Sequence, residues 1–367
     1  MNTDPRARRL ARCALLAVLG LLAGCRHELP PPLPITTLPA VPAGVPPGAP
    51  SVVVPPWSNM VPPTAQTRLM ETGAAGVFMP TLLQRPESAL FGSVRTGARG
   101  AAQFHEGVDI APLRRDRHGE PLDEVRAVAG GVVGYVNRVG GNSNYGQYVV
   151  VLHRDPLGEV YTLYAHLAAA AAGLQPGQPV QAGQPLGRMG HTSSTPIPRD
   201  RAHVHFEIGL MSNARFALWY RAQKLKPDHG NFHGGNLLGV DPLAVFRQQR
   251  QQPAFDFRAF LAQQPAAFEL ALAPTHALDY FQRYPALWEG PAWSGGALVL
   301  RCTENGLPLG GRTATDTERR ALGRGAAAVL RVNEAALGRN GSHLVVKGRG
   351  AWKLGTGGER WLSALVY

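Results

Sequence analysis

Two short histidine-containing motifs hold the side chains in this sequence that are best suited to chemistry. His105 and Asp109 lie four residues apart, and His203 and His205 lie two apart. Residues two or four positions apart in a β-strand point to the same face, so two neighbouring strands would bring three of these side chains together. Imidazole and carboxylate are zinc-type ligands, and three of them leave a fourth position for a water that ionises near neutral pH. The spacing alone does not say which of His203 and His205 would bind the metal.

The pair His105-Glu106 also matches the start of the zinc-binding helix His-Glu-x-x-His, with Asp109 in place of the second histidine. Gly107 and the β-branched Val108 disfavour a helix at this point. We therefore expect a strand or turn here and not a helix.

Short predicted strands surround these motifs between about residues 70 and 250. β-branched and aromatic residues gather at 131–136, 148–152 and 160–166, with Gly-rich turns between them. This pattern favours a mainly β, antiparallel domain over a βαβ arrangement. An irregular aromatic stretch at 210–236 interrupts the pattern.

The last third of the sequence has a different character. Residues 243–264 predict one or two helices, broken at Pro253. Residues 297–367 predict a small, basic α+β or β unit with turns at Asn305-Gly306 and Asn340-Gly341. We therefore expect one domain at 66–250 and a smaller C-terminal domain at 251–367, whose role the sequence does not indicate.

The N-terminal residues are typical of an export signal. A basic stretch with four arginines between residues 6 and 12 precedes ten apolar or small residues, which are too few to span a membrane. The following Leu22-Ala23-Gly24-Cys25 resembles the bacterial lipobox, which implies a signal peptide at 1–24 and lipid on Cys25. Since Arg26 is not Asp, the resemblance implies an outer-membrane lipoprotein facing the periplasm. An ordinary secretory signal cleaved near Ala23 is the alternative.

Proline dominates the segment after this signal. Thirteen of the 34 residues from 30 to 63 are proline, and no charged residue lies between Leu29 and Gln66. Such a composition cannot bury a core and favours extended polyproline II. We expect residues 25–65 to be a linker.

Composition excludes several classes of protein. The chain has 367 residues, 44% hydrophobic and 17% charged, with a formal net charge of +12. These values argue against a disordered chain, a coiled coil and a polytopic membrane protein. Beyond the N-terminal segment Cys302 is the single cysteine, so no intrachain disulfide is possible there. We find no nucleophile elbow, phosphate-binding loop or zinc-finger cysteine pair.

From about His105 to Leu243 the motifs resemble those of the lysostaphin/LytM-type zinc metallopeptidases, which cut peptide bonds in bacterial peptidoglycan. The matching stretches, in chain order, are 105–109, 126–133, 144–146, 161–167, 177–190, 202–207 and 241–243. The resemblance implies an antiparallel, duplicated-hybrid-motif-like core and one Zn²⁺ per chain.

The resemblance also assigns roles to individual residues. It implies that His105, Asp109 and His205 bind zinc, and that His203 and His166 are the catalytic pair beside the metal. We expect His166 to project into the groove from the strand face that it shares with residues 162 and 164.

Two regions depart from the family pattern. The segment Thr192–Arg201 is enlarged, and about 30 residues are inserted between Glu207 and Asp241. We expect both to form loops beside the substrate groove. His229 and His233 in the insertion leave open a second metal site, although turn or substrate contacts are the favoured interpretation.

The favoured hypothesis is a zinc-dependent endopeptidase that cuts peptidoglycan cross-links. The alternative is a non-catalytic LytM-like envelope protein that binds peptidoglycan and regulates amidases at cell division; such proteins usually lack zinc ligands, which are intact here. The expected partners are peptidoglycan and, through the lipid on Cys25, a membrane, with no nucleic acid. An anionic cell-wall polymer is a further candidate for the basic C-terminal unit.

Overall fold

The computed structural model describes residues 56–71, 76–80, 85–96 and 102–367. The predicted signal peptide, the Cys25 anchor and most of the predicted linker lie outside these residues. The described residues belong to one compact unit. None of their helices has both the length and the apolar character needed to cross a membrane.

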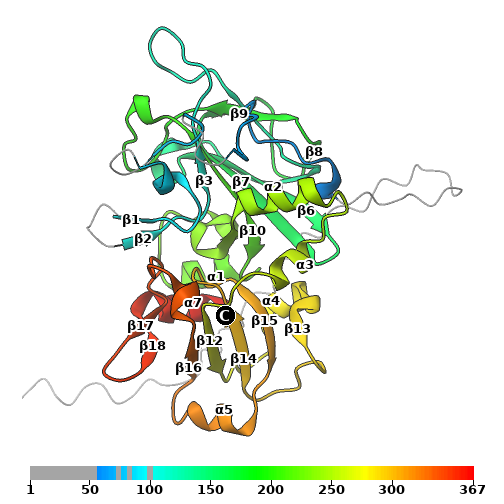
Figure 1. The fold of residues 1–367 in the computed structure, drawn as a ribbon, viewed down its shortest axis with the longest axis vertical. Helices are drawn as coiled ribbons and strands as arrows, with labels where there is room; N and C mark the ends of the chain where they lie inside the picture. The colour runs from blue at the N-terminus through cyan, green and yellow to red at the C-terminus, as the bar shows by residue number, and fades with distance from the viewer. Residues whose placement is uncertain (1–55, 72–75, 81–84, 97–101) are drawn as a thin grey trace, which may run out of the picture. The chain divides into compact units, whose positions relative to one another are not determined.

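A nine-stranded sheet carries the residues of interest, and its neighbouring strands pair antiparallel (Figure 1). Its main path runs β11-β10-β7-β6-β5-β8, while β3 pairs with β10 and β9 pairs with both β7 and β4. The strands are β3 (Val108–Ile110), β4 (Glu124–Arg126), β5 (Gly131–Asn137), β6 (Gln147–Asp155), β7 (Gly158–Ala170), β8 (Pro179–Val180), β9 (Pro185–Met189), β10 (Val204–Met211) and β11 (Leu237–Val240). The predicted mainly β, antiparallel fold is confirmed.

Alternation along β7 and β10 gives the central sheet two distinct faces. Phe206 pairs with Tyr164, and their rings pack 5.3 Å apart in the main hydrophobic core. His205 pairs with Ala165, which belongs to a second apolar cluster with Leu163. Because facing residues of antiparallel strands share one side, His205 lies on the face opposite the main core.

A second sheet of five strands forms the C-terminal part, in the order β13-β15-β14-β12-β16. Its pairs are antiparallel except β13 with β15. The strands are β12 (Phe268–Leu272), β13 (Trp288–Glu289), β14 (Leu298–Cys302), β15 (Pro308–Thr313) and β16 (Ala327–Val332). Two hairpins add β1 (Val94–Thr96) with β2 (Ala102–Phe104), and β17 (Val345–Lys347) with β18 (Trp352–Leu354). Cys302 in β14 is fully buried.

The helices are short and lie mostly in the C-terminal half. They are α1 (Phe216–Ala222), α2 (Pro242–Gln251), α3 (Phe257–Ala262), α4 (Asp279–Arg283), α5 (Asp316–Ala321), α6 (Glu334–Leu337) and α7 (Thr356–Leu365). Asp241 and Asp256 cap α2 and α3 by accepting from backbone N–H groups. These two helices flank Pro253, as the sequence predicts. The stretch expected to be irregular instead contains α1, whose Phe216 and Trp219 are buried.

The two sheets share one hydrophobic core, which contains Phe206 as well as Leu270. Hydrogen bonds also join the large sheet and its flanking loop to the C-terminal part of the chain: Tyr284 Oη donates to the carbonyl of Glu159 at 2.7 Å, and Asn213 Nδ2 donates to the carbonyl of Ala364 at 2.7 Å. The predicted boundary near residue 250 therefore marks a change of sheet and not a gap in packing.

Residues 56–63, which fall in the predicted linker, are packed against the large sheet. Trp57 is fully buried and donates from Nε1 to Asp155 Oδ2 at 2.7 Å. Val61 N–H bonds to the carbonyl of Val128, and the carbonyl of Pro63 accepts from Arg126 N–H. A tryptophan that has both an apolar pocket and a polar partner anchors its segment, so residues 56–63 belong to the packed part of the chain.

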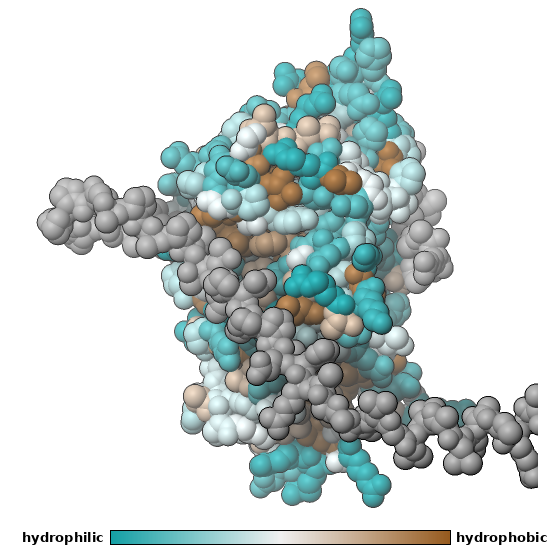
Figure 2. Space-filling view, turned by 180° about the vertical axis from the view of Figure 1, so that it is seen from behind, coloured by the Kyte–Doolittle hydropathy of each residue, from teal (hydrophilic) through white to brown (hydrophobic). Residues whose placement is uncertain are grey.

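Few large apolar side chains remain at the surface of the described residues. Leu113, Leu122, Val139 and Leu218 are exposed. On the face seen in Figure 2, hydrophobic residues occur in small groups among hydrophilic ones.

Candidate metal centre and neighbouring histidines

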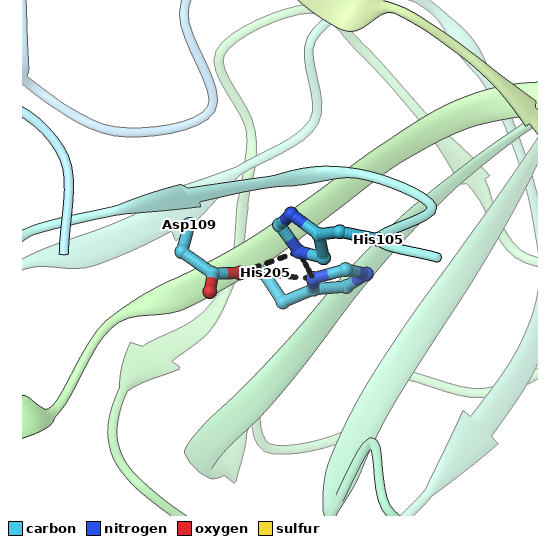
Figure 3. A group of neighbouring side chains, drawn as sticks. All are labelled: His105, Asp109 and His205. Carbon is cyan, nitrogen blue, oxygen red and sulfur yellow. Dashed lines mark hydrogen bonds and ion pairs between the residues drawn. The ribbon is translucent and has the colours of Figure 1, made fainter. Parts of the chain in front are cut away.

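Three side chains from separate segments converge beside β10 (Figure 3). His105 follows β2, Asp109 lies in β3, and His205 in β10 is paired with Asp109. His105 Nε2 is 3.1 Å from Asp109 Oδ1 and 3.0 Å from His205 Nδ1. His205 Nδ1 is 2.9 Å from Asp109 Oδ1. The three residues implied as zinc ligands by the family resemblance are thus brought together.

Gly107 allows the segment between His105 and Asp109 to lie against β10. A Cβ at this position would overlap the carbonyl oxygen of Phe206. Any other residue would push the segment away from the strand that carries His205.

The donor set fits a zinc ion. Two imidazole nitrogens and one carboxylate oxygen meet within hydrogen-bond distance of one another, and each of the three residues is buried. Such atoms bind zinc at about 2.0–2.2 Å, so three of them at this spacing can share one ion. Within the described ranges, no other group of three His, Cys, Asp or Glu side chains is placed to do so.

A buried carboxylate orients His205 from behind. Glu207 Oε1 accepts from His205 Nε2 at 2.9 Å, so the other ring nitrogen, Nδ1, is the one directed at the ligand cluster. Glu207 is fully buried and accepts from Tyr145 Oη at 2.7 Å and Tyr161 Oη at 2.8 Å. A partner of this kind fixes the tautomer of a ligating histidine. The motif analysis included Glu207 without assigning it this role.

Arg95 in β1 supports the ligands from the opposite side. Its Nη2 donates to Asp109 Oδ2 at 2.6 Å and to the carbonyl of Ser88 at 2.7 Å. His105 Nδ1 lies 2.9 Å from the carbonyl of Leu90 and 3.0 Å from Arg95 Nη2, so Nε2 is the ring nitrogen that faces Asp109 and His205. Sequence reasoning missed Arg95, because it precedes the matching motifs.

Charges within the cluster set the protonation of the ligands. Burial would raise the pKa of Asp109, but His105, His203 and Arg95 outweigh it and hold that pKa well below its usual value. Burial lowers the pKa of His105 to about 4. Asp109 is therefore a carboxylate and His105 a neutral imidazole, the forms that bind a metal. Burial would lower the pKa of His205, but hydrogen bonds to Asp109 and Glu207 outweigh it and raise that pKa to about 9, so a metal that binds at Nδ1 would displace a proton.

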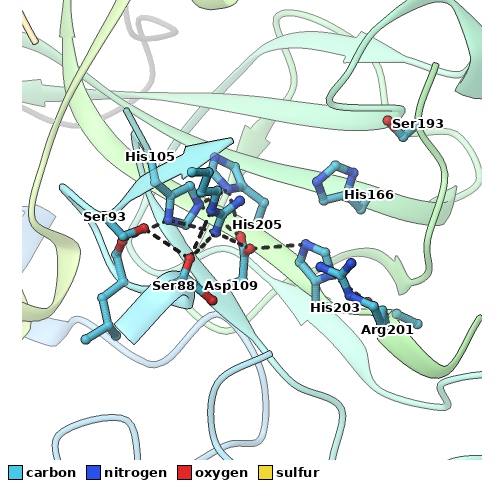
Figure 4. A network of polar contacts seen from close by, with 12 residues as sticks. Ser88, Ser93, His105, Asp109, His166, Ser193, Arg201, His203 and His205 are labelled. Atoms are coloured by element: carbon cyan, nitrogen blue, oxygen red, sulfur yellow. Dashed lines mark hydrogen bonds and ion pairs between the residues drawn. The ribbon is translucent and has the colours of Figure 1, made fainter. Parts of the chain in front are cut away.

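His166 and His203 lie side by side next to the ligand cluster (Figure 4). Their ring centroids are 4.8 Å apart. His203 Nδ1 is 2.7 Å from the carbonyl of Arg201, and His166 Nδ1 is 2.9 Å from the carbonyl of Thr192. A carbonyl only accepts, so both rings carry the proton on Nδ1 and present Nε2 as a base. His203 Nε2 points toward Asp109, with 3.5 Å to Oδ2.

Both of these rings are neutral at pH 7. Burial, followed by the nearby charges of His203 and His205, holds the pKa of His166 well below its usual value. Burial likewise lowers the pKa of His203. Two neutral imidazoles beside a metal site can accept protons from a reacting group.

His166 reaches this position by a route different from the predicted one. Thr162 and Tyr164, the residues expected to share its face, are fully buried and hydrogen-bonded to each other. Tyr164 belongs to the main core, on the other side of the sheet from His205. His166 has a φ of +60°, and this left-handed residue breaks the alternation and turns its ring toward the site.

The neighbouring turn explains the motif Asn144-Tyr145-Gly146. Gly146 has a φ of +62°, and a Cβ there would overlap the carbonyl of Thr192. Gln147 N–H bonds to Thr192 Oγ1, which in turn donates to the carbonyl of Leu167. Thr192 is thereby fixed, and its carbonyl can hold His166.

The histidines of the insertion do not form a second metal site in the structure. His229 bonds through its two ring nitrogens to Tyr135 Oη and the carbonyl of Asn142. His233 Nδ1 accepts from Gly235 N–H, and its ring packs on Tyr220 with centroids 4.6 Å apart. Both have structural partners, in agreement with the favoured interpretation of turn contacts.

Residues 103–215 match the family described as peptidase family M23. This range includes His105, Asp109, His166, His203 and His205. The predicted resemblance to lysostaphin/LytM-type peptidases is confirmed for this part of the chain. No curated protein matches the sequence significantly.

Several solved structures are similar to parts of the chain. The catalytic domain of the antimicrobial peptidase lysostaphin from Staphylococcus simulans has 24% identity and a TM-score of 0.24, covering 33% of this chain and 76% of that one. A putative glycyl-glycine endopeptidase LytM from Ruminococcus gnavus has 23% identity and a TM-score of 0.26, covering 50% and 63%. Csd3 from Helicobacter pylori has 21% identity and a TM-score of 0.23, covering 48% and 41%. The chain spans less than two thirds of the last two, and similarities this low do not bear on activity.

Proposed function

Since residues 103–215 carry a domain of peptidase family M23, we propose that this chain is a zinc-dependent endopeptidase that hydrolyses peptide cross-links of bacterial peptidoglycan. The main support is the convergence of three metal-type ligands with two neutral histidines beside them. A non-catalytic relative would not need His166 and His203 to lie beside the ligands as neutral imidazoles.

His105, Asp109 and His205 would hold one Zn²⁺. Zinc, when bound, supplies Lewis acidity that makes a water more acidic and polarises a carbonyl. Glu207 and Arg95 keep the ligand residues in place. Glu207 bonds to His205 Nε2 and Arg95 to Asp109 Oδ2, the atoms of these residues that do not face the cluster centre.

His203 and His166 would move the protons. Each presents an unprotonated Nε2, which accepts the proton that the attacking water releases. Once protonated, the same nitrogen becomes a donor. It then stabilises the oxyanion of the tetrahedral intermediate or protonates the leaving amine.

For the cellular setting, we propose a lipoprotein with its signal peptide at 1–24, lipid on Cys25, and the peptidase part facing the periplasm from the outer membrane. The Pro-rich segment would act as a tether between the membrane and the substrate. Without residues 1–24, which hold four arginines and one aspartate, the formal net charge of +12 falls to +9, and this positive charge suits an anionic envelope.

The test is incubation of the full-length protein with purified sacculi, with and without a chelator, followed by mass spectrometry of the released fragments. We expect chelator-sensitive loss of cross-linked dimers, restored by added zinc, and the fragment masses identify the cleaved bond. Intact sacculi in the presence of bound zinc would contradict the proposal and favour the regulatory, non-catalytic alternative.

A further inference from the structure

Arg201 is a cation beside the candidate site that has no ionic partner among the described residues. It ends the 3₁₀ turn Arg199–Arg201, two residues before His203. Its Nε is buried and lacks any hydrogen-bond partner there. A buried donor without a partner is costly, and more so in a charged group, so this arrangement calls for an explanation.

The carbonyl of Arg201 accepts from His203 Nδ1, so the arginine and the histidine are held together. Figure 4 draws the side chain of Arg201 beside His203, on the side away from Asp109. Arg201 remains partly exposed and is therefore accessible to a molecule that enters the site.

The backbone that carries Arg201 is braced by the neighbouring loop. Arg115 donates from Nη1 to the carbonyl of Arg199 at 2.8 Å and from Nη2 to that of Asp200 at 3.0 Å. Arg199 in turn forms an ion pair with Glu120 Oε1 at 2.7 Å. These contacts hold the backbone turn that carries Arg201 in place before any substrate arrives.

Apart from the exposed Asp200, the carboxylates near Arg201 are engaged by other groups. Asp109 is paired with Arg95, and Glu120 with Arg199. Glu207 is bonded by His205 and two tyrosines. Asp200 is exposed and forms no ion pair among the described residues. The internal segments 72–75, 81–84 and 97–101 contain no Asp or Glu.

We propose that Arg201 binds a free carboxylate of the peptide substrate, next to the scissile bond. The planar guanidinium matches a carboxylate through two parallel hydrogen bonds, and in a peptide the anionic groups are side-chain or terminal carboxylates. This inference rests on the proposed function. It adds that the preferred substrate is acidic on the side of the scissile bond that lies over His203.

The test uses two synthetic cross-linked stem-peptide dimers, one with free carboxylates beside the scissile bond and one with primary amides there. For wild-type protein loaded with zinc, we expect kcat/KM to be about 10- to 100-fold higher for the acid than for the amide. In Arg201→Gln this ratio falls toward one. In Arg201→Lys the ratio is intermediate, because lysine keeps the positive charge but lacks the two parallel N–H donors of the guanidinium. Arg117→Gln, which removes an exposed arginine from the adjacent loop, keeps the wild-type ratio.

An unchanged ratio in Arg201→Gln, or no preference in the wild type, would overturn the inference. Failure of the wild type to cleave either dimer would count against the proposed function instead. In that case calorimetric binding of the two dimers decides the inference separately. A Kd for the acid that is about 10-fold weaker in Arg201→Gln than in wild type supports it, and equal values refute it.

Discussion

The two halves of the candidate site differ in how fully their polar atoms are used. On the ligand half, His105, Asp109 and His205 are backed by Leu90, Arg95 and Glu207, so each ligand residue has an outer partner. On the other half, His166 and His203 are hydrogen-bonded through Nδ1 to backbone carbonyls, and His203 Nε2 also lies 3.5 Å from Asp109 Oδ2. Arg201 beside them has no ionic partner among the described residues.

This difference indicates a division of tasks. In the ligand half, the outer partners hold the geometry of the ligands, as a metal site requires. An unsaturated half keeps bases and a cation available for groups that arrive with the substrate. Substitutions that should affect one half of the site and not the other test this division.

The largest effects on zinc content and activity should come from substituting single residues, one in each half of the site at a time. His105→Ala or Asp109→Asn should lose both zinc and activity, because each removes one of three ligands. His203→Ala should keep most of the zinc and lose about 10²- to 10⁴-fold in kcat, the usual contribution of a general acid or base. Metal analysis of the purified proteins, together with sacculus digestion, measures both.

His205→Ala is the control for this division. If it retained zinc while His203→Ala lost it, the roles of the two histidines would be inverted.

A smaller effect should follow from weakening the support of the ligand half. Glu207→Gln leaves the ligands in place but removes the charge that orients His205. We expect zinc affinity to fall about 10- to 100-fold in competition titrations with a chelating dye. Tyr161→Phe, which removes one hydrogen bond to Glu207, should change affinity less. Equal zinc affinity in Glu207→Gln and wild type would argue against the proposed support.

The support of the other half can be tested at Gly146. Gly146→Ala would displace Thr192, whose carbonyl holds His166, and would strain a residue with positive φ. We expect a loss of about 1–3 kcal/mol in unfolding free energy and a lower kcat, with zinc content unchanged. Gly141→Ala, where a Cβ meets nothing within 4 Å, is the matched control. Loss of zinc in Gly146→Ala would show that the two halves are not independent.

The smallest effect concerns a histidine outside the site. Burial lowers the pKa of His153 to about 4, and both ring nitrogens are bonded, to the carbonyl of Gly130 and to Thr162 Oγ1. Its folded pKa lies below the unfolded value of about 6.5, so its stabilising contribution is present above pH 6.5 and is lost as pH falls toward 4. The loss is at most about 3 kcal/mol. Urea unfolding of wild type and His153→Gln at pH 7 and pH 5 should show a smaller decrease in the variant; parallel decreases would contradict this assignment.

Much of the large sheet and the meeting of the ligands followed from the sequence. Strand periodicity and the i,i+2 and i,i+4 spacings depend on local geometry alone, so His105, Asp109 and the pair His203 and His205 were identifiable. The choice of His205 as the ligand came from the family resemblance, because spacing does not distinguish the two histidines. Arg95 and the role of Glu207 were not, because their contacts depend on pairing between segments distant in the chain. The packing of Trp57 was not predicted, because the proline-rich composition around it favours a linker and one tryptophan does not change that interpretation.

The left-handed backbone conformation of His166 lowers the stability of the folded chain, and this affects how the chain would respond to selection for heat resistance. A residue other than glycine, asparagine or aspartate in this region is disfavoured by about 1–2 kcal/mol, and that penalty is retained here at a histidine beside the metal centre. Random selection for heat resistance should therefore favour glycine or asparagine at this position. The resulting proteins would melt at higher temperature and lose the proposed peptidase activity, so stability screens of this chain need an activity screen alongside them.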